Sequence, residues 1–361
     1  MNYRLTKIWP RKSYGSDTTE TIDIDVADPI SQLIIELAAN ITDDTAITAH
    51  VINCLTKIEL LDGSDVLFSL SGPQAEAADW YNNHVIRSPW NIYMGWGETQ
   101  RFIAINFGTK LWDPSLAFDP TKFKNPQLKL TLDIDAGGAV PTLNRLGVWA
   151  AMFDQKKIAP IGFLMHKEIK NFTMGASSHE YTDLPRDYPY RKLFLRAHSA
   201  GTEPGQLIDT LKLYEEEGKR IIIDNELPDM ILRTIANSPQ IDEYIHARVA
   251  TSATNIYCTP TTRVYPVATE LETTSGSGGL AVQMGDGGRF AAIAASAQKY
   301  ASFHVKGYLP HGVFELPFGD QDNPDDWYDV TTLGSLKADV LSASGASGKA
   351  CQLFLQQLRQ Y

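Results

Sequence analysis

The sequence predicts an all-β protein built from two tandem β-sandwiches, each flanked by one short helix. Three observations predict this fold class: apolar and polar residues alternate over many short segments, 361 residues are enough for two domains, and four sequence blocks occur twice in the same order. The 3.6-residue periodicity that an α/β fold needs between its strands is missing.

The composition is typical of a folded protein with a net negative charge. Hydrophobic residues make up 43% and charged residues 21% of the chain, which is close to the average for soluble globular proteins. The formal net charge of −11 excludes a broad nucleic-acid surface, because neutralising phosphates needs clustered Lys and Arg. We therefore expect no direct, sequence-specific binding of nucleic acid.

Neither the cysteines nor the first residues indicate secretion. Cys54, Cys258 and Cys351 form no C-x-x-C pair and are too few for a disulfide framework. The N-terminal segment lacks the apolar core of a signal peptide, and no run of about 18 apolar residues occurs in the sequence. We expect the protein to be made in a cytoplasm.

A unit of two strands and a short helix occurs twice. In the first copy, alternating residues over 58–61 and 66–70 flank a turn at Gly63, which predicts a hairpin. Residues 62–73 then match residues 217–228 without a gap, and just upstream residues 58–60 match residues 211–213. A glycine turn, an apolar strand and a proline that begins a helix thus recur together.

Two further pairs of blocks extend the repeat. Residues 105–133 resemble residues 316–342, and residues 29–39 parallel residues 189–199. Repeats of this length are whole domains rather than solenoid units, and about eight candidate strands in each favour a jelly-roll sandwich over a meander barrel. The residues that define the repeat are Gly63, Pro73, Phe107, Gly108, Gly218, Pro228, Phe318 and Gly319.

The repeat also sets the domain boundaries. We predict an N-terminal basic arm over residues 1–17, a first jelly roll over 18–156 and a second over 157–361. The distance from the repeated helix to the next Phe-Gly pair is much longer in the second copy, which predicts an insertion at about 237–302. Loops of this length in compact domains are usually functional or carry their own structure, so we interpret the insertion as a surface projection.

The first twelve residues are basic and aromatic and contain no acidic residue. Such a segment can contact an anionic lipid surface through its cations and its aromatic rings. A floppy terminus, or one tucked under a neighbouring molecule, is the competing interpretation. The candidate membrane-facing residues are Arg4, Lys7, Trp9, Arg11 and Lys12.

The sequence contains no recognisable catalytic, cofactor-binding or metal site. It has no phosphate-binding glycine motif, no G-x-S-x-G elbow, no H-E-x-x-H motif and no Cys/His cluster. One acidic loop offers oxygen ligands for Ca²⁺, but its proline and its missing glycine do not fit an EF-hand and favour a solvated turn. This loop contains Asp320, Asp322, Asn323, Asp325 and Asp326.

Two other functions stay open on the residues alone. Trp90, Tyr93 and Trp96 can stack on a sugar, as in a carbohydrate-binding spike or lectin protein, although core or interface packing is the commoner use of such residues. A double-sandwich, glycan-active enzyme would need paired carboxylates between its domains, which distant residues can supply without leaving a motif. A deep acidic cleft at the domain junction would support the enzyme.

The chain resembles the double jelly-roll major capsid proteins of tailless icosahedral viruses with an internal membrane, including members from bacteriophages. The resemblance rests on the tandem sandwiches, on a short helix in each, on one long insertion, and on two segments, NFGTKLWDPSLAFDPTKFKNPQLKLTLD and LPRDYPYRKLFLRA. It spans nearly the whole chain but transfers no functional residue.

The resemblance implies a structural, non-catalytic coat protein of an icosahedral virion, made in the host cytoplasm and without a cofactor. Three copies would form a homotrimer whose six sandwiches make a pseudo-hexagonal capsomer. The capsomer would contact neighbouring capsomers and minor capsid or vertex proteins. The resemblance also implies that the basic arm lies inside, near an internal lipid membrane, and that the insertion points outward.

Overall fold

A computed structural model describes most of the chain as strands arranged in sandwiches, and the described part contains two α-helices. In the same described part, seven short 3-10 turns connect some of the strands. They are η1 (Val51–Cys54), η2 (Pro120–Lys122), η3 (Asp135–Gly137), η4 (Pro204–Gln206), η5 (Glu216–Gly218), η6 (Pro324–Asp326) and η7 (Ser344–Ala346). The described residues are 2–40, 48–87, 90–93, 97–138, 142–272, 279–295 and 298–361.

The first sandwich pairs two four-stranded antiparallel sheets, whose alternating side chains fill the space between them. If its eight strands are numbered along the chain, with β6 set aside, the sheets have the jelly-roll orders 1-8-3-6 and 2-7-4-5. One sheet contains β1 (Tyr3–Tyr14), β9 (Thr142–Phe153), β3 (Ile30–Asn40) and β7 (Glu98–Asn106). The other contains β2 (Thr18–Asp23), β8 (Pro126–Leu132), β4 (Leu55–Asp62) and β5 (Asp65–Leu70).

The second sandwich repeats this strand order without a change. Its sheets again read 1-8-3-6 and 2-7-4-5 once the inserted strands are set aside, so the prediction of two jelly rolls is confirmed. One sheet contains β10 (Gly162–Thr173), β23 (Ala350–Gln360), β12 (Tyr190–His198) and β21 (Val313–Pro317). The other contains β11 (His179–Asp183), β22 (Leu336–Ser342), β13 (Ile208–Glu215) and β14 (Arg220–Glu226).

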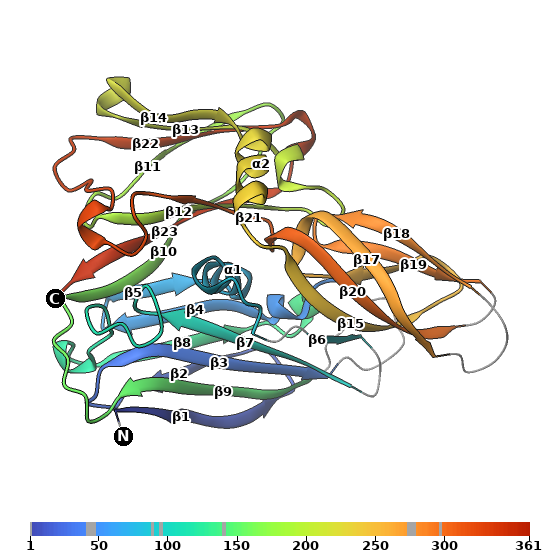
Figure 1. The fold of residues 1–361 in the computed structure, drawn as a ribbon, viewed down its shortest axis with the longest axis horizontal. Coiled ribbons are helices and arrows are strands. Elements are labelled where there is room, and N and C mark those ends of the chain that lie inside the picture. Colours follow the sequence, from blue (N-terminus) through green and yellow to red (C-terminus); the bar gives the residue numbers. More distant parts are fainter. Residues whose placement is uncertain are drawn as a thin grey trace.

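The two sandwiches are joined edge to edge. Strand β5 pairs in parallel with β10, which merges one sheet of each sandwich into a sheet of eight strands. Figure 1 shows the sandwiches stacked, with β1 at one end of the stack and β14 at the other. The internal junction pairs the fifth strand of the first sandwich with the first strand of the second. The outer edges are formed by the remaining first strand, β1, and the remaining fifth strand, β14, because the duplicated domains face the same way.

Each sandwich carries one α-helix at the same place, directly after its fifth strand. Helices α1 (Gly72–Asn83) and α2 (Leu227–Asn237) both have a proline in the first turn, where the missing N–H costs no hydrogen bond. They differ in their surroundings, because every residue of α1 from Gly72 to Tyr81 is buried, whereas α2 buries only Leu227, Met230 and Ile231.

The insertion forms a sheet of its own and extends to Pro310, further than the predicted boundary at residue 302. Its strands are β15 (Ile241–Val249), β16 (Thr254–Tyr257), β17 (Pro260–Glu272), β18 (Leu280–Asp286), β19 (Arg289–Ala294) and β20 (Lys299–Pro310). Strand β6 (Trp90–Tyr93) of the first sandwich pairs in parallel with β15 and completes seven strands. Figure 1 shows this sheet projecting to one side of the stack.

The hydrophobic cores do not follow the order of the chain. The inserted sheet shares one apolar cluster with the first sandwich, through residues such as Ile245 and Phe303, although it is inserted into the second. The second sandwich has a further cluster that includes Leu211 and Leu353, although residues such as its Phe354 belong to the shared cluster. The insertion thus ties the two halves together, since it is covalently part of one and packed on the other.

We expect Gly72→Ala to destabilise the fold by roughly 1–3 kcal/mol. A Cβ at Gly72 would lie 2.6 Å from the carbonyl oxygen of Ile52, so the start of α1 would have to move away from η1. Gly345→Ala is the matched control, because a Cβ added there would have no neighbouring atom within 4 Å and the φ of Gly345 is not positive. Urea denaturation should separate the two variants, and equal stabilities would contradict the prediction.

Candidate functional site: the junction between the sandwiches

The structure places the residues that define the repeat at matching positions of the two sandwiches. Gly63 and Gly218 occupy the turns before β5 and β14 with positive φ angles of 62° and 91°, which glycine adopts without strain. The two prolines begin the helices, and both Phe-Gly pairs directly follow the sixth strand of their sandwich, β7 or β21. These are Pro73, Pro228, Phe107, Gly108, Phe318 and Gly319.

The junction proper is built from β5, α1 and β10. His166 on β10 pairs with Phe68 on β5, and their rings lie 5.4 Å apart. Gln74 of α1 donates a hydrogen bond from Nε2 to Glu168 Oε2 at 2.7 Å. Strand pairing, an apolar contact and a polar contact thus all cross from one sandwich to the other.

An ion pair closes one end of the same junction. Arg359 at the end of β23 donates two hydrogen bonds to the carboxylate of Asp65 at the start of β5, one of them from Nη1 at 3.0 Å. This fork geometry fixes both position and direction. It also lowers the pKa of Asp65, through hydrogen bonding and charge.

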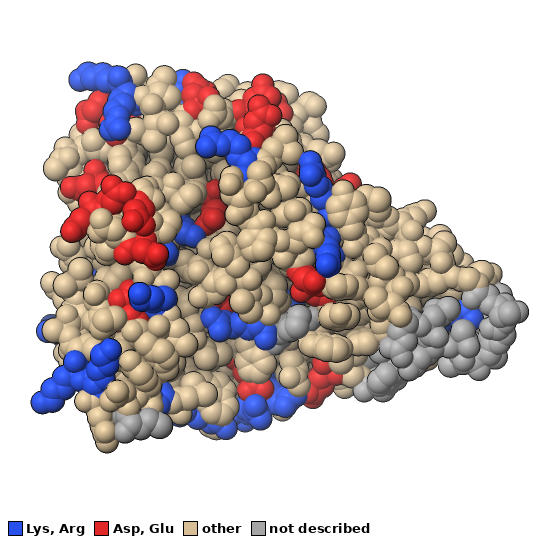
Figure 2. All heavy atoms as spheres, viewed as in Figure 1, with Lys and Arg blue, Asp and Glu red and all other residues tan. Residues whose placement is uncertain are grey.

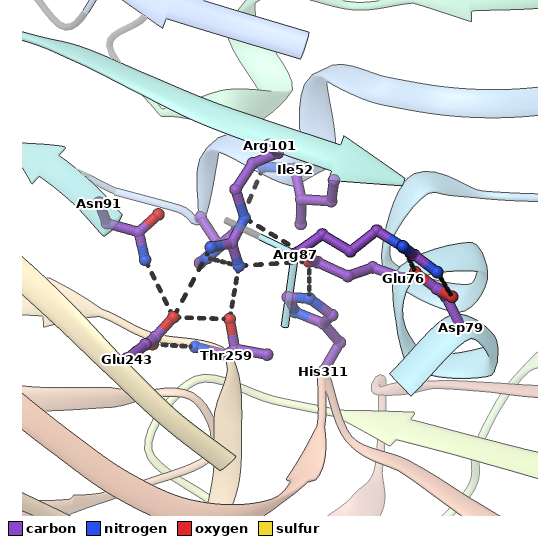
Figure 3. A network of polar contacts seen from close by, with 10 residues as sticks. Ile52, Glu76, Asp79, Arg87, Asn91, Arg101, Glu243, Thr259 and His311 are labelled. Carbon is purple, nitrogen blue, oxygen red and sulfur yellow. Dashed lines mark hydrogen bonds and ion pairs between the residues drawn. The ribbon is translucent and has the colours of Figure 1, made fainter. Parts of the chain in front are cut away.

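A buried ionic network ties the first sandwich to the inserted sheet (Figure 3). Its centre is Arg101 on β7, whose side chain is fully buried. Arg101 Nε lies 3.2 Å from Glu76 Oε1 on α1, and its Nη1 lies 3.7 Å from Glu243 Oε2 on β15. Its Nη2 donates to the hydroxyl oxygen of Thr259 at 2.6 Å. One guanidinium therefore bridges three elements that are far apart in the chain.

Both carboxylates have further donors. Glu243 accepts from the Thr259 backbone N–H at 2.7 Å, from its hydroxyl at 2.9 Å and from Asn91 Nδ2 at 3.1 Å. Glu76 Oε2 lies 2.6 Å from His311 Nε2, in the turn that precedes β21. Buried charges are tolerated in this way when hydrogen bonds satisfy them.

Burial and neighbouring charges shift the pKa values of three groups in this network. Burial by itself raises the pKa of Glu76, but Arg101 and His311 outweigh it and hold that pKa below the ordinary value of 4.5. Burial lowers the pKa of His311 below 6.5, so the imidazole is neutral and donates its Nε2–H to a charged Glu76. Burial also raises the pKa of Glu243, against the opposing effect of Arg101.

The network is not arranged for catalysis on a substrate. Glu76, Arg101 and Glu243 have between 0% and 4% of their side chains exposed, so a glycan cannot reach the carboxylates. These carboxylates, which lie between the first sandwich and the inserted sheet, therefore do not form the open acidic cleft that a glycan-active enzyme would need. The network instead holds β7, α1 and β15 together through buried ionic contacts.

The predicted basic arm is mostly strand β1, paired along its length with β9. Its cations contact groups of the same chain: Arg4 lies 2.5 Å from Asp28, and Arg11 lies 2.7 Å from Glu36. Lys7 lies over the ring of Trp149, and Lys12 lies over the ring of Trp9. The segment is therefore an edge strand of the first sandwich, and removing residues 1–14 would remove a sandwich strand rather than a free arm.

The predicted sugar-binding row is divided. Trp90 is 52% exposed and stacks on Tyr244 at 5.2 Å and on His246 at 5.7 Å. Tyr93 is only 3% exposed and belongs to the core, so it cannot stack on a sugar. Trp96 lies outside the described residues.

Other candidates from the sequence have local roles. In the acidic loop, Asp326 accepts a hydrogen bond from the backbone N–H of Asp320 at 2.6 Å, and Asn323 accepts one from that of Asp325 at 3.3 Å, so these side chains hold a turn.

The described residues contain no group of three or more His, Cys, Asp or Glu that could hold a metal ion. All three cysteines are free and buried. In the described part of the chain, no helix has the length and apolarity to cross a bilayer.

Sequence reasoning missed the ionic network. The signal was present in Arg101, a lone cation in the strand TQRFIAIN, and in Glu76 and Glu243. It could not be used, because the partners lie on separate elements whose packing the sequence pattern does not reveal.

Comparisons with known proteins rest on structure, since no family model and no curated protein match the sequence. The STIV major capsid protein is 10% identical, with a TM-score of 0.60 over 100% of this chain and 97% of that chain. The major capsid protein from Bacteriophage PM2 is 9% identical, with a TM-score of 0.55 over 99% and 98%. The PBCV-1 virus capsid structure is 10% identical, with a TM-score of 0.57 over 99% and 94%. The fold of this chain is thus the double jelly roll of these proteins.

Proposed function

We propose that this chain is the major capsid protein of an icosahedral virion, a structural and non-catalytic coat protein found in the virion. The observation that carries the proposal is the fold: two jelly rolls of one strand order fill the chain, and the similar structures are capsid proteins over nearly their whole length.

In this proposal the working unit is a homotrimer with six sandwiches. Because a duplicated domain presents similar edges at regular intervals, three copies make a tile close to a hexagon, which can pack on neighbouring capsomers and on minor capsid or vertex proteins. The small differences between the two sandwiches then set the orientation of each tile. The edge-to-edge junction of β5 and β10 within the chain supports this arrangement.

The charge distribution suits such a tile. Figure 2 shows both signs of charge spread over one face, with Lys and Arg along the lower margin, where Figure 1 places β1. A net charge of −11 keeps free capsomers soluble and makes their association sensitive to salt. Contact of Arg4, Lys7, Trp9, Arg11 and Lys12 with an internal membrane stays a prediction, as does the absence of direct nucleic-acid binding.

We expect purified protein to run as a trimer at micromolar concentration, with a mass three times 40.0 kDa. Light scattering after size exclusion measures the mass, and electron microscopy should show hexagonal tiles or closed shells. A stable monomer that forms neither would contradict the proposal. Binding to a glycan array that is lost in Trp90→Ala, by a protein that never assembles, would favour the carbohydrate-binding alternative.

A further inference from the structure

We infer that a second copy of this chain docks its strand β1 on strand β14, in the register by which β10 docks on β5 within one chain. The inference rests on the proposed coat function and names the contact surface of the capsomer. The internal junction is the template, because β14 is the second-sandwich equivalent of β5, and β1 is the first-sandwich equivalent of β10.

Both strands are edges that are unpaired within the described chain. Strand β14 pairs with β13 on one side only, and β1 pairs with β9 on one side only. Apolar side chains are exposed at both places: Leu5 on β1 is 61% exposed, Ile221 on β14 is 50% exposed and Leu232 on α2 is 49% exposed. Exposed apolar edge strands are sites of association with another chain.

The register follows from pairings inside each sandwich. Leu33 pairs with Ala150, which pairs with Thr6; in the second sandwich, Leu193 pairs with Leu355, which pairs with Lys167. Since Leu33 and Leu193 are equivalent in the repeat, Thr6 is the equivalent of Lys167.

The irregularities of the strands support this alignment. Strand β1 has a bulge between Lys7 and Trp9, and β10 has one between Glu168 and Lys170, directly after the aligned residues. Strand bulges are specific features of a strand rather than random defects. The alignment therefore makes Leu5 the equivalent of His166.

The partner positions on β14 come from the gapless match of residues 62–73 with 217–228. In the template, Phe68 pairs with His166, and Ser69 pairs with Lys167. The equivalents of Phe68 and Ser69 are Ile223 and Asp224. We therefore expect Leu5 of the second copy to pair with Ile223, and Thr6 of the second copy to pair with Asp224.

A groove lies where Leu5 of the second copy would insert. It has a volume of about 480 Å³ and is lined by β14, α2 and β21, through residues that include Ile223, Met230 and Leu316. The equivalent site of the first sandwich, lined by Phe68, Ala75 and Ile105, has a free volume of about 0 Å³, and His166 of the second sandwich contributes to its lining. The groove is thus the same site without its strand partner.

The charges at equivalent positions are complementary across the inferred contact. The template ion pair joins Asp65 to Arg359; the equivalent of Asp65 is Arg220, which is 69% exposed and also lies 3.0 Å from Glu215 of its own chain. The equivalent of Arg359 is Asp154, because Phe153 and Leu358 bond to the equivalent carbonyls of Pro29 and Pro189. The sign of each residue is reversed, so the pair is again attractive.

A second pair of equivalent residues also carries opposite charges across the inferred contact. The template hydrogen bond joins Gln74 of α1 to Glu168 of β10. The equivalent residues are Asp229 in the first turn of α2 and Lys7 of β1, both exposed. Lys7 of one copy would therefore lie beside Asp229 of the other, an attraction between opposite charges.

A lipid surface is the less favoured occupant of β1. Arg4 and Arg11 are paired with carboxylates of their own chain, so much of the positive charge of this strand is already neutralised. The contact between copies is heterologous, since each chain uses β1 on one side and β14 on the other. Such contacts give a closed ring when the rotation closes, and an open filament otherwise.

Disulfide cross-linking of the full chain tests the register. Neighbouring strands are about 4.8 Å apart, within reach of a disulfide, so Thr6→Cys combined with Asp224→Cys should cross-link chains under mild oxidation. Denaturing gels should show linked dimers and linked trimers. Thr6→Cys combined with Arg220→Cys, further along the same edge, is the matched control and should give no linked species. A product that stops at dimers would overturn the heterologous contact.

A charge exchange tests the same contact without oxidation. Lys7→Glu and Asp229→Lys should each weaken trimer association by about tenfold, which corresponds to about 1.4 kcal/mol, and the double variant should restore it. Light scattering over a dilution series gives the dissociation constant. Failure of the double variant to recover would count against the inference.

The outcomes separate this inference from the proposed function. Trimers that form without the Thr6–Asp224 cross-link would leave the coat function standing and refute the register. A protein that stays monomeric would refute both. If Lys7→Glu abolishes binding to vesicles of phosphatidylglycerol and phosphatidylcholine but leaves trimers intact, strand β1 faces lipid and the inference is wrong.

Discussion

Arg101→Met is expected to lower the free energy of unfolding by about 3–5 kcal/mol. The change removes the only cation that the structure shows within 4 Å of both Glu76 and Glu243 in the described network, and it leaves two buried carboxylates facing an apolar side chain. Breaking a buried ion pair on one side is strongly destabilising for this reason. Urea denaturation followed by tryptophan fluorescence measures the effect.

Two matched variants show whether the buried network causes the loss. Lys129→Met removes an exposed cation that lies 3.7 Å from Glu59, and we expect a change of at most about 1 kcal/mol. Arg101→Met combined with Glu76→Gln and Glu243→Gln should recover part of the lost stability, since both negative charges are then gone. If Arg101→Met is as stable as Lys129→Met, the network does not hold the inserted sheet on the first sandwich.

The protein is expected to lose stability steeply as the pH falls below 6.5. Burial lowers the pKa of five histidines: His50 well below 6.5, His166 and His198 to about 3, and His84 and His311 in the same direction. Below pH 6.5 the unfolded chain binds protons at these positions and the folded chain does not, so unfolding becomes more favourable. Each group contributes up to about 1.4 kcal/mol per pH unit.

The carboxylates modify this dependence at lower pH. The lowered pKa of Glu76 adds a further loss of stability as the pH falls below 4.5. The raised pKa of Glu243 acts in the opposite direction above pH 4.5, but it is one carboxylate against five histidines. Since folded domains are typically stable by only about 5–15 kcal/mol, we expect acid unfolding within about two pH units below 6.5.

His166→Leu should reduce the slope of stability against pH by up to about 1.4 kcal/mol per pH unit. Leucine is a suitable replacement, because Leu5 is the residue at the equivalent position of the first sandwich. His179→Gln is the control, since its side chain is 48% exposed, and it should keep the steep slope. Thermal unfolding between pH 7 and pH 5 provides the comparison, and an unchanged slope in His166→Leu would contradict this account.

The sequence predicted the duplication from features that act locally. Glycine turns at Gly63 and Gly218, and the helix-starting prolines Pro73 and Pro228, recur because the same backbone path must be formed twice. Alternation of apolar residues showed which segments are strands, since one face of each is buried. These signals were enough for two sandwiches of one kind and for the place of the long insertion.

Contacts between distant segments were decided only by the tertiary structure. The N-terminal segment looked like a free basic arm, yet it completes a sheet through β9, a strand more than a hundred residues away. The insertion packs on the first sandwich although it interrupts the second, and β6 joins its sheet. No sequence motif marks the Arg101 network or the groove beside α2, because each is formed by residues on separate elements that come together only when these elements pack. Local periodicity records which face of a strand is buried, but not which distant strand covers it.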